Sequence, residues 1–238
     1  SADLHKYGYA PKGASVLLHR GRERLRAQYF ATTRWPGYPV VNPTMLGSRS
    51  AAPPAAAWAI VQALGKDGLG RLARSSLRAT SALLAAVDGI EGLRVVGRPA
   101  GPLFAVATDD GVPADRRVDP HHWADAVRRL GWLLQLQPGL RQGDGSRLPH
   151  TTHLTVTPVT EGVLQPLADA LRQAAEEVRG VPAVDPAAAL AAMGGDPSVA
   201  LDGPLPEALA PLLALVEALP SEQTEALLVD LLARLVEP

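Results

Sequence analysis

Short apolar runs and longer amphipathic runs alternate along the middle of this chain, and this alternation limits the folds open to it. Four short runs predict β-strands, because they are apolar or alternate apolar with polar residues: 93–97, 102–108, 132–137 and 152–158. Residues 121–130 and 161–179 instead carry the helical period. The sequence therefore predicts a small α+β domain over residues 93–180.

The segments on either side of this domain differ from it. Towards the N-terminus, residues 14–19 (ASVLLH) predict a short strand, residues 22–42 predict irregular structure, and residues 51–64 and 67–88 predict two helices. From residue 181 the chain is rich in Pro, Ala, Gly and Leu, and residues 204–238 predict two short helices. We expect three parts: residues 1–92, 93–180 and a helical tail over 181–238.

Composition excludes several classes of function. The 23 basic and 24 acidic residues give a net charge of −1, so no field attracts nucleic acid or an anionic membrane surface. The absence of cysteine excludes disulfides, thiolate metal ligands and a cysteine nucleophile. No apolar run approaches the roughly 20 residues of a membrane span.

The histidines do not predict a metal site. His121 and His122 are adjacent, and neighbouring side chains on a helix point about 100° apart. His150 and His153 flank a predicted strand start without other ligands nearby in sequence. We therefore expect no bound metal.

The first thirteen residues, SADLHKYGYAPKG, concentrate chemically useful side chains. Imine catalysis needs a lysine that is held in place and can lose its proton, and Lys6 lies between a histidine and a Tyr-Gly pair. The dipeptide His-Lys by itself is common, and on the dipeptide alone a solvated surface lysine is the better explanation.

The longer pattern resembles a known family. SADLHKYGYAPKG is similar to the pyridoxal-phosphate lysine segment of the sphingosine-1-phosphate lyases and the related group II amino-acid decarboxylases. The resemblance continues through WPGYPVVNPTMLGSR at 35–49 and AAAWAIVQALGKDG at 55–68, and more weakly to about residue 180. It implies an α/β fold, the C-terminal part of an aspartate aminotransferase-like (fold type I) enzyme, with residues 1–92 ending the large cofactor-binding domain.

The resemblance also assigns roles to individual residues. It implies that Lys6 forms an imine with the aldehyde of pyridoxal 5'-phosphate and that His5 contacts this cofactor. Gly47 and Ser48 fall where the family presents an amide and a hydroxyl to the cofactor phosphate, usually across the interface of a homodimer. A phosphate at the start of a helix is physically reasonable, although Ser48 or Ser50 could equally be an ordinary helix cap.

Lys12 bears on the substrate. In the lyase branch a second lysine follows the first and lies near the phosphate of a phosphorylated amino alcohol, whereas the decarboxylase branch generally lacks it. The resemblance thus implies a carbon–carbon lyase acting on a small phosphorylated amine, with an amino-acid decarboxylase as the alternative. A third possibility is a catalytically silent fragment that acts in association, since the family places half of the active site before this lysine. We expect a truncated chain and take the cytoplasm as its default location.

Overall fold

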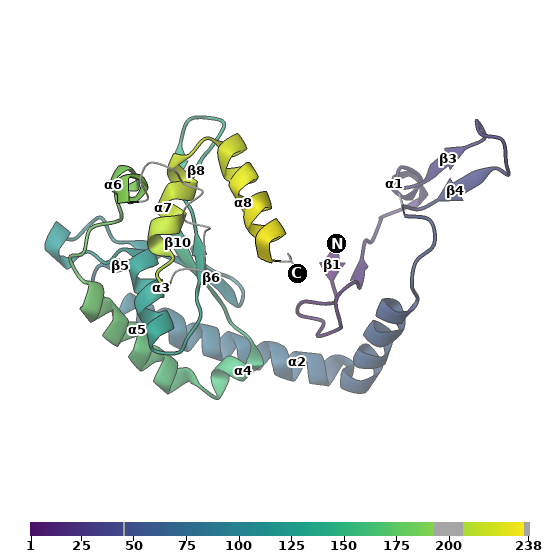
Figure 1. Ribbon diagram of the computed structural model, residues 1–238. Coiled ribbons are helices and arrows are strands. Elements are labelled where there is room, and N and C mark those ends of the chain that lie inside the picture. Colours follow the sequence, from purple (N-terminus) through teal and green to yellow (C-terminus); the bar gives the residue numbers. More distant parts are fainter. Residues whose placement is uncertain (45, 193–206, 236–238) are drawn as a thin grey trace. The chain divides into compact units, whose positions relative to one another are not determined.

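The computed structural model describes residues 1–44, 46–192 and 207–235 (Figure 1). Contacts between Cα atoms divide the chain into two compact units, Ser1–Arg74 and Ser75–Pro238. The boundary falls inside one long helix, α2 (Ala52–Asp88). The division expected from sequence, at residues 92 and 180, stays a prediction.

The first unit contains two small antiparallel pairs of strands. β1 (Ala2–Asp3) pairs with β2 (Ser15–Val16), and β3 (Phe30–Thr32) pairs with β4 (Val40–Asn42). A five-residue helix, α1 (Arg22–Arg26), lies between them in sequence. The buried core of this first unit is small and consists of Ala10, Ala14 and Ala57, with Leu4 packed against them. Local hydrogen bonds rather than a large apolar core therefore hold this unit.

The prediction of irregular structure over residues 22–42 is wrong, because α1 and the β3–β4 hairpin lie there. The hairpin loop is closed by Trp35, whose Nε1 donates to the Tyr38 carbonyl oxygen at 2.6 Å. The two rings also meet in a T-shaped, edge-to-face arrangement, with centroids 5.7 Å apart. Pro36 and Pro39 fall in the loop and not in the strands, so the backbone pairing is uninterrupted.

The helices predicted at 51–64 and 67–88 are confirmed as the two parts of α2. Between them Gly65 has φ 59° and ψ −174°, a conformation that side-chain-bearing residues rarely adopt. The break therefore depends on glycine.

The second unit is built on a four-stranded antiparallel sheet of order β5-β6-β10-β7. Its strands are β5 (Leu93–Val95), β6 (Leu103–Thr108), β7 (Gln135–Gln137) and β10 (Thr151–Thr155). β8 (Leu140–Arg141) and β9 (Arg147–Leu148) form a separate hairpin. The four strands predicted within 93–158 are confirmed, although those at 93–97, 132–137 and 152–158 are shorter than expected.

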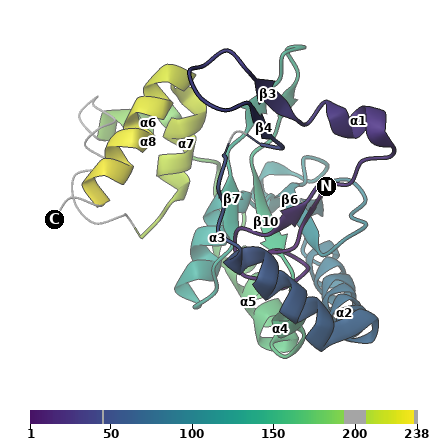
Figure 2. The same ribbon diagram turned by 90° about the vertical axis from the view of Figure 1, so that its right-hand side faces the viewer.

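The helices of this unit are α3 (Pro120–Arg129), α4 (Pro158–Glu161), α5 (Leu164–Val178), α6 (Pro186–Ala192), α7 (Ala210–Ala218) and α8 (Ser221–Leu235), with a 3-10 turn at Ala114–Arg116. Figure 1 and the view turned by 90° in Figure 2 both show α3 and α5 beside the sheet. The two tail helices predicted within 204–238 are α7 and α8, and α6 was not predicted. No helix in the described ranges is long and apolar enough to span a membrane.

One large apolar core joins the sheet, α3, α5 and the end of α2. Trp123 of α3 is fully buried, and its Nε1 donates to the Leu171 carbonyl oxygen at 2.9 Å. Leu154 of β10 lies opposite Phe104 of β6, and both side chains are buried in the same core. Burying one such large side chain contributes about 1.5–3 kcal/mol, so this core stabilises the second unit.

Candidate functional site

The predicted lysine lies in a tightly closed loop between β1 and β2. The Lys6 backbone N–H donates to the Asp3 carbonyl oxygen at 3.1 Å, and that of Ala10 to Leu4 at 2.9 Å. Gly8 has no room for a side chain, because a Cβ there would lie 2.6 Å from the Leu4 carbonyl oxygen. Tyr9 has φ 58°, a strained value for a tyrosine. The backbone around Lys6 is therefore firmly shaped.

The side chain of Lys6 forms an ion pair within this loop. Its Nζ lies 2.7 Å from Oδ2 of Asp3, and the two side chains are 65% and 38% exposed. The hydrogen bond from Lys6, followed by the charge of its ammonium, lowers the pKa of Asp3. Lys6 is thus engaged in a contact that solvent can also reach.

His5 is fixed by the opposite side of the loop. Its Nδ1 lies 3.0 Å from the Ala14 carbonyl oxygen, which also accepts the His5 backbone N–H at 3.2 Å. Because a carbonyl oxygen only accepts, Nδ1 carries a proton and Nε2 is the acceptor of the neutral ring. The ring of His5 is therefore oriented before any ligand arrives.

The segment containing Gly47 and Ser48 meets the lysine loop at a groove of ≈ 660 Å³ within the first unit. Ser48, Arg49 and Ser50 line it, together with the start of α2 and the residues that follow the lysine loop, Gly13 to Val16. Among the described residues, His5, Lys6, Lys12 and Gly47 are not part of its lining. The structure thus brings Ser48 to the flank of the lysine loop, but it does not gather all five predicted residues into one cavity.

Ser48 and Ser50 differ in what their hydroxyls contact. The Ser50 Oγ accepts the backbone N–H of Ala52 at 3.2 Å, which is a cap at the start of α2. Ser48 and Gly47 are exposed, and no helix-capping bond of Ser48 is seen in the described part of the chain. Of the two candidate caps, Ser50 holds that role, which leaves the Ser48 hydroxyl available.

Lys12 is exposed in the turn that leads back to β2. The following residue, Gly13, has φ 98°, and a Cβ there would lie 3.2 Å from the side chain of Pro53. No ion pair of Lys12 occurs among residues 1–44, 46–192 and 207–235. This geometry does not test the roles predicted for the site residues, which stay predictions.

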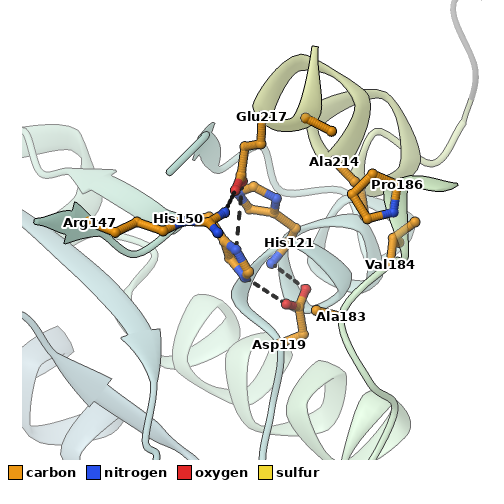
Figure 3. A pocket seen from close by; sticks show the side chains of 11 residues that line it. Asp119, His121, Arg147, His150, Ala183, Val184, Pro186, Ala214 and Glu217 are labelled. Carbon is orange, nitrogen blue, oxygen red and sulfur yellow. Dashed lines mark hydrogen bonds and ion pairs between the residues drawn. The ribbon is translucent and has the colours of Figure 1, made fainter. Parts of the chain in front are cut away.

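A second cluster of polar residues surrounds a pocket of ≈ 290 Å³ in the second unit (Figure 3). His150 Nε2 lies 2.7 Å from Asp119 Oδ2, and its Nδ1 lies 3.6 Å from Glu217 Oε1. Glu217 also accepts from Arg147 at 2.9 Å. The His121 ring lies beside that of His150, with centroids 4.6 Å apart. Segments far apart in sequence therefore place two carboxylates on one imidazole.

The environment shifts the pKa values of this cluster in different directions. The hydrogen bond to Asp119 raises the pKa of His150 against the opposing effect of burial. Burial and then the charge of His150 lower the pKa of His121. Burial alone would raise the pKa of Asp119, but hydrogen bonds from His150 and from the His122 backbone bring it below its usual value. The cluster thus favours one charged and one neutral histidine.

No sequence pattern identifies this cluster. Asp119 is recognisable as a helix cap before Pro120, and its Oδ1 accepts the N–H groups of His121 and His122 at 3.0 and 2.9 Å. Nothing in the sequence joins it to His150 or to Glu217. In the described residues no group of three or more His, Asp or Glu is arranged to hold a metal ion.

Comparison with known proteins gives relatives for about three quarters of the chain. It is 31% identical over 182 residues to sphingosine-1-phosphate lyase of Arabidopsis thaliana, covering 76% of this chain and 30% of that protein. It is 32% identical over 157 residues to the lyase of Drosophila melanogaster, covering 66% of this chain and 26% of that one. The chain thus spans about 30% of the length of these curated relatives.

Solved structures agree with the predicted fold. The sphingosine-1-phosphate lyase of Burkholderia pseudomallei matches with a TM-score of 0.63 and 37% identity, over 75% of this chain and 37% of that one. A glutamate decarboxylase of Lactobacillus brevis matches with a TM-score of 0.52 and 16% identity, over 67% of this chain and 35% of that one. The second match bears on the fold alone. The predicted α/β, type I fold is confirmed.

A family model described as "Pyridoxal-dependent enzyme, C-terminal putative HTH domain" matches residues 163–234. Despite the helix-turn-helix in that description, this segment contains 3 arginines, no lysine and 11 acidic residues, which is unsuited to binding a phosphate backbone. The description agrees with the predicted pyridoxal cofactor. The chain is therefore related to the pyridoxal-dependent, sphingosine-1-phosphate lyase-like enzymes, and its similarity extends over part of their length.

Proposed function

We propose that this chain is part of a pyridoxal-phosphate-dependent carbon–carbon lyase that cleaves a phosphorylated amino alcohol. The observation that carries the proposal is the closed loop over residues 2–16, which holds Lys6 on a firmly shaped backbone beside an oriented His5. An unstructured surface lysine would not require the glycine at position 8 or the strained backbone of Tyr9. The similarity to several lyases supports the same reading.

The reaction proposed is a retro-aldol cleavage. The bond between the amine-bearing carbon and the hydroxyl-bearing carbon breaks, and the hydroxyl loses its proton as its carbon becomes an aldehyde. The other carbon gains a proton, which gives phosphoethanolamine. When bound, pyridoxal phosphate supplies a conjugated ring that accepts the electron pair of the broken bond.

Lys6 must become a neutral amine before it can bind an aldehyde covalently. Its present partner, Asp3, stabilises the ammonium form, so the two side chains must separate first. Because the pair is exposed and therefore weak, this exchange requires little free energy. His5, fixed through Nδ1, presents Nε2 as a hydrogen-bond acceptor in its neutral form.

The groove beside Ser48 fits the phosphate end of such a cofactor. Its lining includes three serines, Ser15, Ser48 and Ser50, and the guanidinium-bearing Arg49. Charged donors and hydroxyls are the groups that phosphate oxygens accept from. Pro53 and Pro54 remove two backbone donors from the start of α2, so the side chains carry this role. Gly47 leaves the backbone beside Ser48 open, since among the described residues the nearest approach to its Cβ position is the side chain of Asn42, at 4.0 Å.

Lys12 carries the proposal of a phosphorylated substrate. It is an exposed cation six positions after Lys6 and on the same closed loop. An anionic group on the substrate is what such an ammonium would attract.

We also propose a homodimer whose active site is shared between subunits. The support is a set of exposed large apolar side chains around the β3–β4 hairpin: Tyr29, Phe30, Trp35, Tyr38 and Val41. Such patches commonly mark interfaces. Sedimentation equilibrium that gives only a monomer would contradict this part. A cytoplasmic location rests on the sequence alone.

The test of the function is a product assay on the enzyme that contains this sequence. Release of an aldehyde and phosphoethanolamine from a phosphorylated amino alcohol supports the lyase. Carbon dioxide from an amino acid, without the other products, would transfer the assignment to the decarboxylase. No activity toward either class would favour a silent association fragment.

Lys12→Ala sharpens the assay. The loss of a charge-assisted contact should cost about 2–3 kcal/mol, or roughly 30- to 150-fold in kcat/KM, for the phosphorylated substrate. The corresponding unphosphorylated amine should be affected much less. Lys66→Ala is the matched control, because Lys66 is an exposed lysine on α2. Equal losses on both substrates would remove the phosphate role of Lys12.

A further inference from the structure

Helix α7 is attached to the rest of the second unit at both of its ends. Ala210 and Leu215 of this helix are buried, so it is not a loose appendage. Its first residues meet α3, and Glu217 near its last turn reaches β9 and His150 (Figure 3). The two attachments have different chemistry.

The N-terminal attachment is a buried carboxylate. Asp125 of α3 accepts the backbone N–H of Leu209 through Oδ1 and that of Ala210 through Oδ2, both at 2.9 Å. These N–H groups have no partner inside a helix, and a carboxylate also complements the positive end of the helix dipole. Because no histidine takes part, this attachment does not depend on a histidine proton.

The C-terminal attachment passes through His150. The Glu217 side chain is only 8% exposed and lies 3.6 Å from His150 Nδ1 through Oε1. The other nitrogen of the same ring is 2.7 Å from Asp119. A Cβ at Gly139 would lie 2.9 Å from Glu217 Oε2, so the carboxylate is confined from that side as well.

Only one protonation state of His150 suits this arrangement. The imidazolium has two N–H groups: one is hydrogen-bonded to Asp119, and the other faces Glu217, which the positive ring attracts across 3.6 Å. A neutral ring has a single N–H and must turn a lone pair toward either Asp119 or Glu217. One anion would then be left facing that lone pair in a half-buried site, which is unfavourable.

Several other charged or titratable groups face His150. His121 lies beside it from α3, and Arg147 of β9 shares Glu217. His150 also lines an adjoining cavity of ≈ 480 Å³ together with Arg117 and Asp110, whose side chains lie 4.0 Å apart. His122 adds charge near Asp119 when protonated. Arg147 keeps its ion pair with Glu217 when His150 loses its proton, so the end of α7 is then only partly released from the rest of the unit.

We propose that His150 is a protonation-controlled latch: its imidazolium holds the C-terminal half of α7 by bridging Asp119 and Glu217, and loss of its proton loosens that half, which stays tied to Arg147, and widens access to the pocket beneath it. The pocket is lined by Ala214, Glu217 and Ala218 of α7, so their movement changes access to it. The latch does not depend on the proposed lyase activity.

The sign of the pH effect follows from the raised pKa of His150. The stabilisation is fully present below the ordinary histidine value and is lost as pH rises through the higher value in the folded chain. The lowered pKa of His121 acts only below its ordinary value, where it disfavours the folded state. Measurements above roughly pH 6.5 therefore isolate His150.

The test is amide hydrogen exchange of the whole chain at roughly pH 6.5 and pH 9, corrected for intrinsic exchange. The Leu219 N–H, bonded to Leu215, should lose protection by about tenfold or more at the higher pH. The Ala210 N–H, bonded to Asp125, should change little and serves as an internal control.

His150→Gln should give low, pH-independent protection at Leu219, whereas His153→Gln in β10 should behave like the unmodified chain. Protection of Val156, bonded to Pro102 in the sheet, reports whether each variant is folded. If His150→Gln does not fold, Glu217→Gln provides the same test from the helix side. Equal protection of Leu219 at both pH values, or a pH response that survives in the folded variant, would overturn the latch.

Discussion

The lysine loop and the His150 pocket neutralise their charges in opposite ways. Lys6 pairs with Asp3, three residues away, and both side chains remain open to solvent. His150 joins Asp119, thirty-one positions away, and Glu217 on another helix, and the two carboxylates are 5% and 8% exposed. One pair is local and exposed, and the other is long-range and buried.

This difference suits different tasks. An exposed ion pair contributes little and exchanges partners readily, which a lysine that must bind an aldehyde requires. A buried ionic network is costly to break, because removing one partner leaves a charge without compensation. The two clusters are distinguished by the exposure of their side chains and not by where they lie in the chain.

The largest effect should come from the core that supports the His150 pocket. Trp123→Ala removes a fully buried ring and its hydrogen bond to Leu171, at an expected cost of about 3–5 kcal/mol in the free energy of unfolding. Trp58→Ala is the matched control, since Trp58 is 67% exposed in the first unit and should cost less than about 0.5 kcal/mol. Urea denaturation measures both. Similar losses of unfolding free energy in the two variants would contradict the contrast between a well-packed second unit and a weakly packed first unit.

A smaller effect is expected at the groove beside the lysine loop. If the Ser48 hydroxyl contacts the cofactor phosphate, Ser48→Ala should cost about 1.5–3 kcal/mol, or about tenfold or more in pyridoxal phosphate affinity. Its unfolding free energy should not change, because Ser50 caps α2. A fluorescence titration of the enzyme with the cofactor gives the affinity. Unchanged binding would leave Ser48 without a cofactor role.

Sequence was sufficient where the signal is local. The break in α2 near Gly65, the strands β5 and β6, and helix α3 all follow from residues within a few positions of each other. The hairpin at 30–42 was missed because its strands have three residues each and its loop contains two prolines. A Trp35–Tyr38 contact closes it, and strand propensity does not report such a contact.

The candidate sites divide in the same way. Lys6, His5 and Lys12 were found because they share thirteen residues that resemble a known segment. The cluster of Asp119, His150 and Glu217 depends on how α7 and β9 meet the start of α3, which no sequence spacing encodes. In the sequence His121 is adjacent to His122, and that pair was considered and rejected as a metal site. In the structure the ring of His121 instead lies beside that of His150.

The most direct test of the central claim uses the small number of lysines in the chain: Lys6, Lys12 and Lys66. The enzyme is incubated with pyridoxal phosphate, reduced with borohydride and mapped by peptide mass spectrometry. The account predicts that the reduced cofactor is found on Lys6 and that Lys6→Arg abolishes the labelling while Lys66→Arg does not. Labelling confined to Lys12 or Lys66, or labelling that persists in Lys6→Arg, would contradict it.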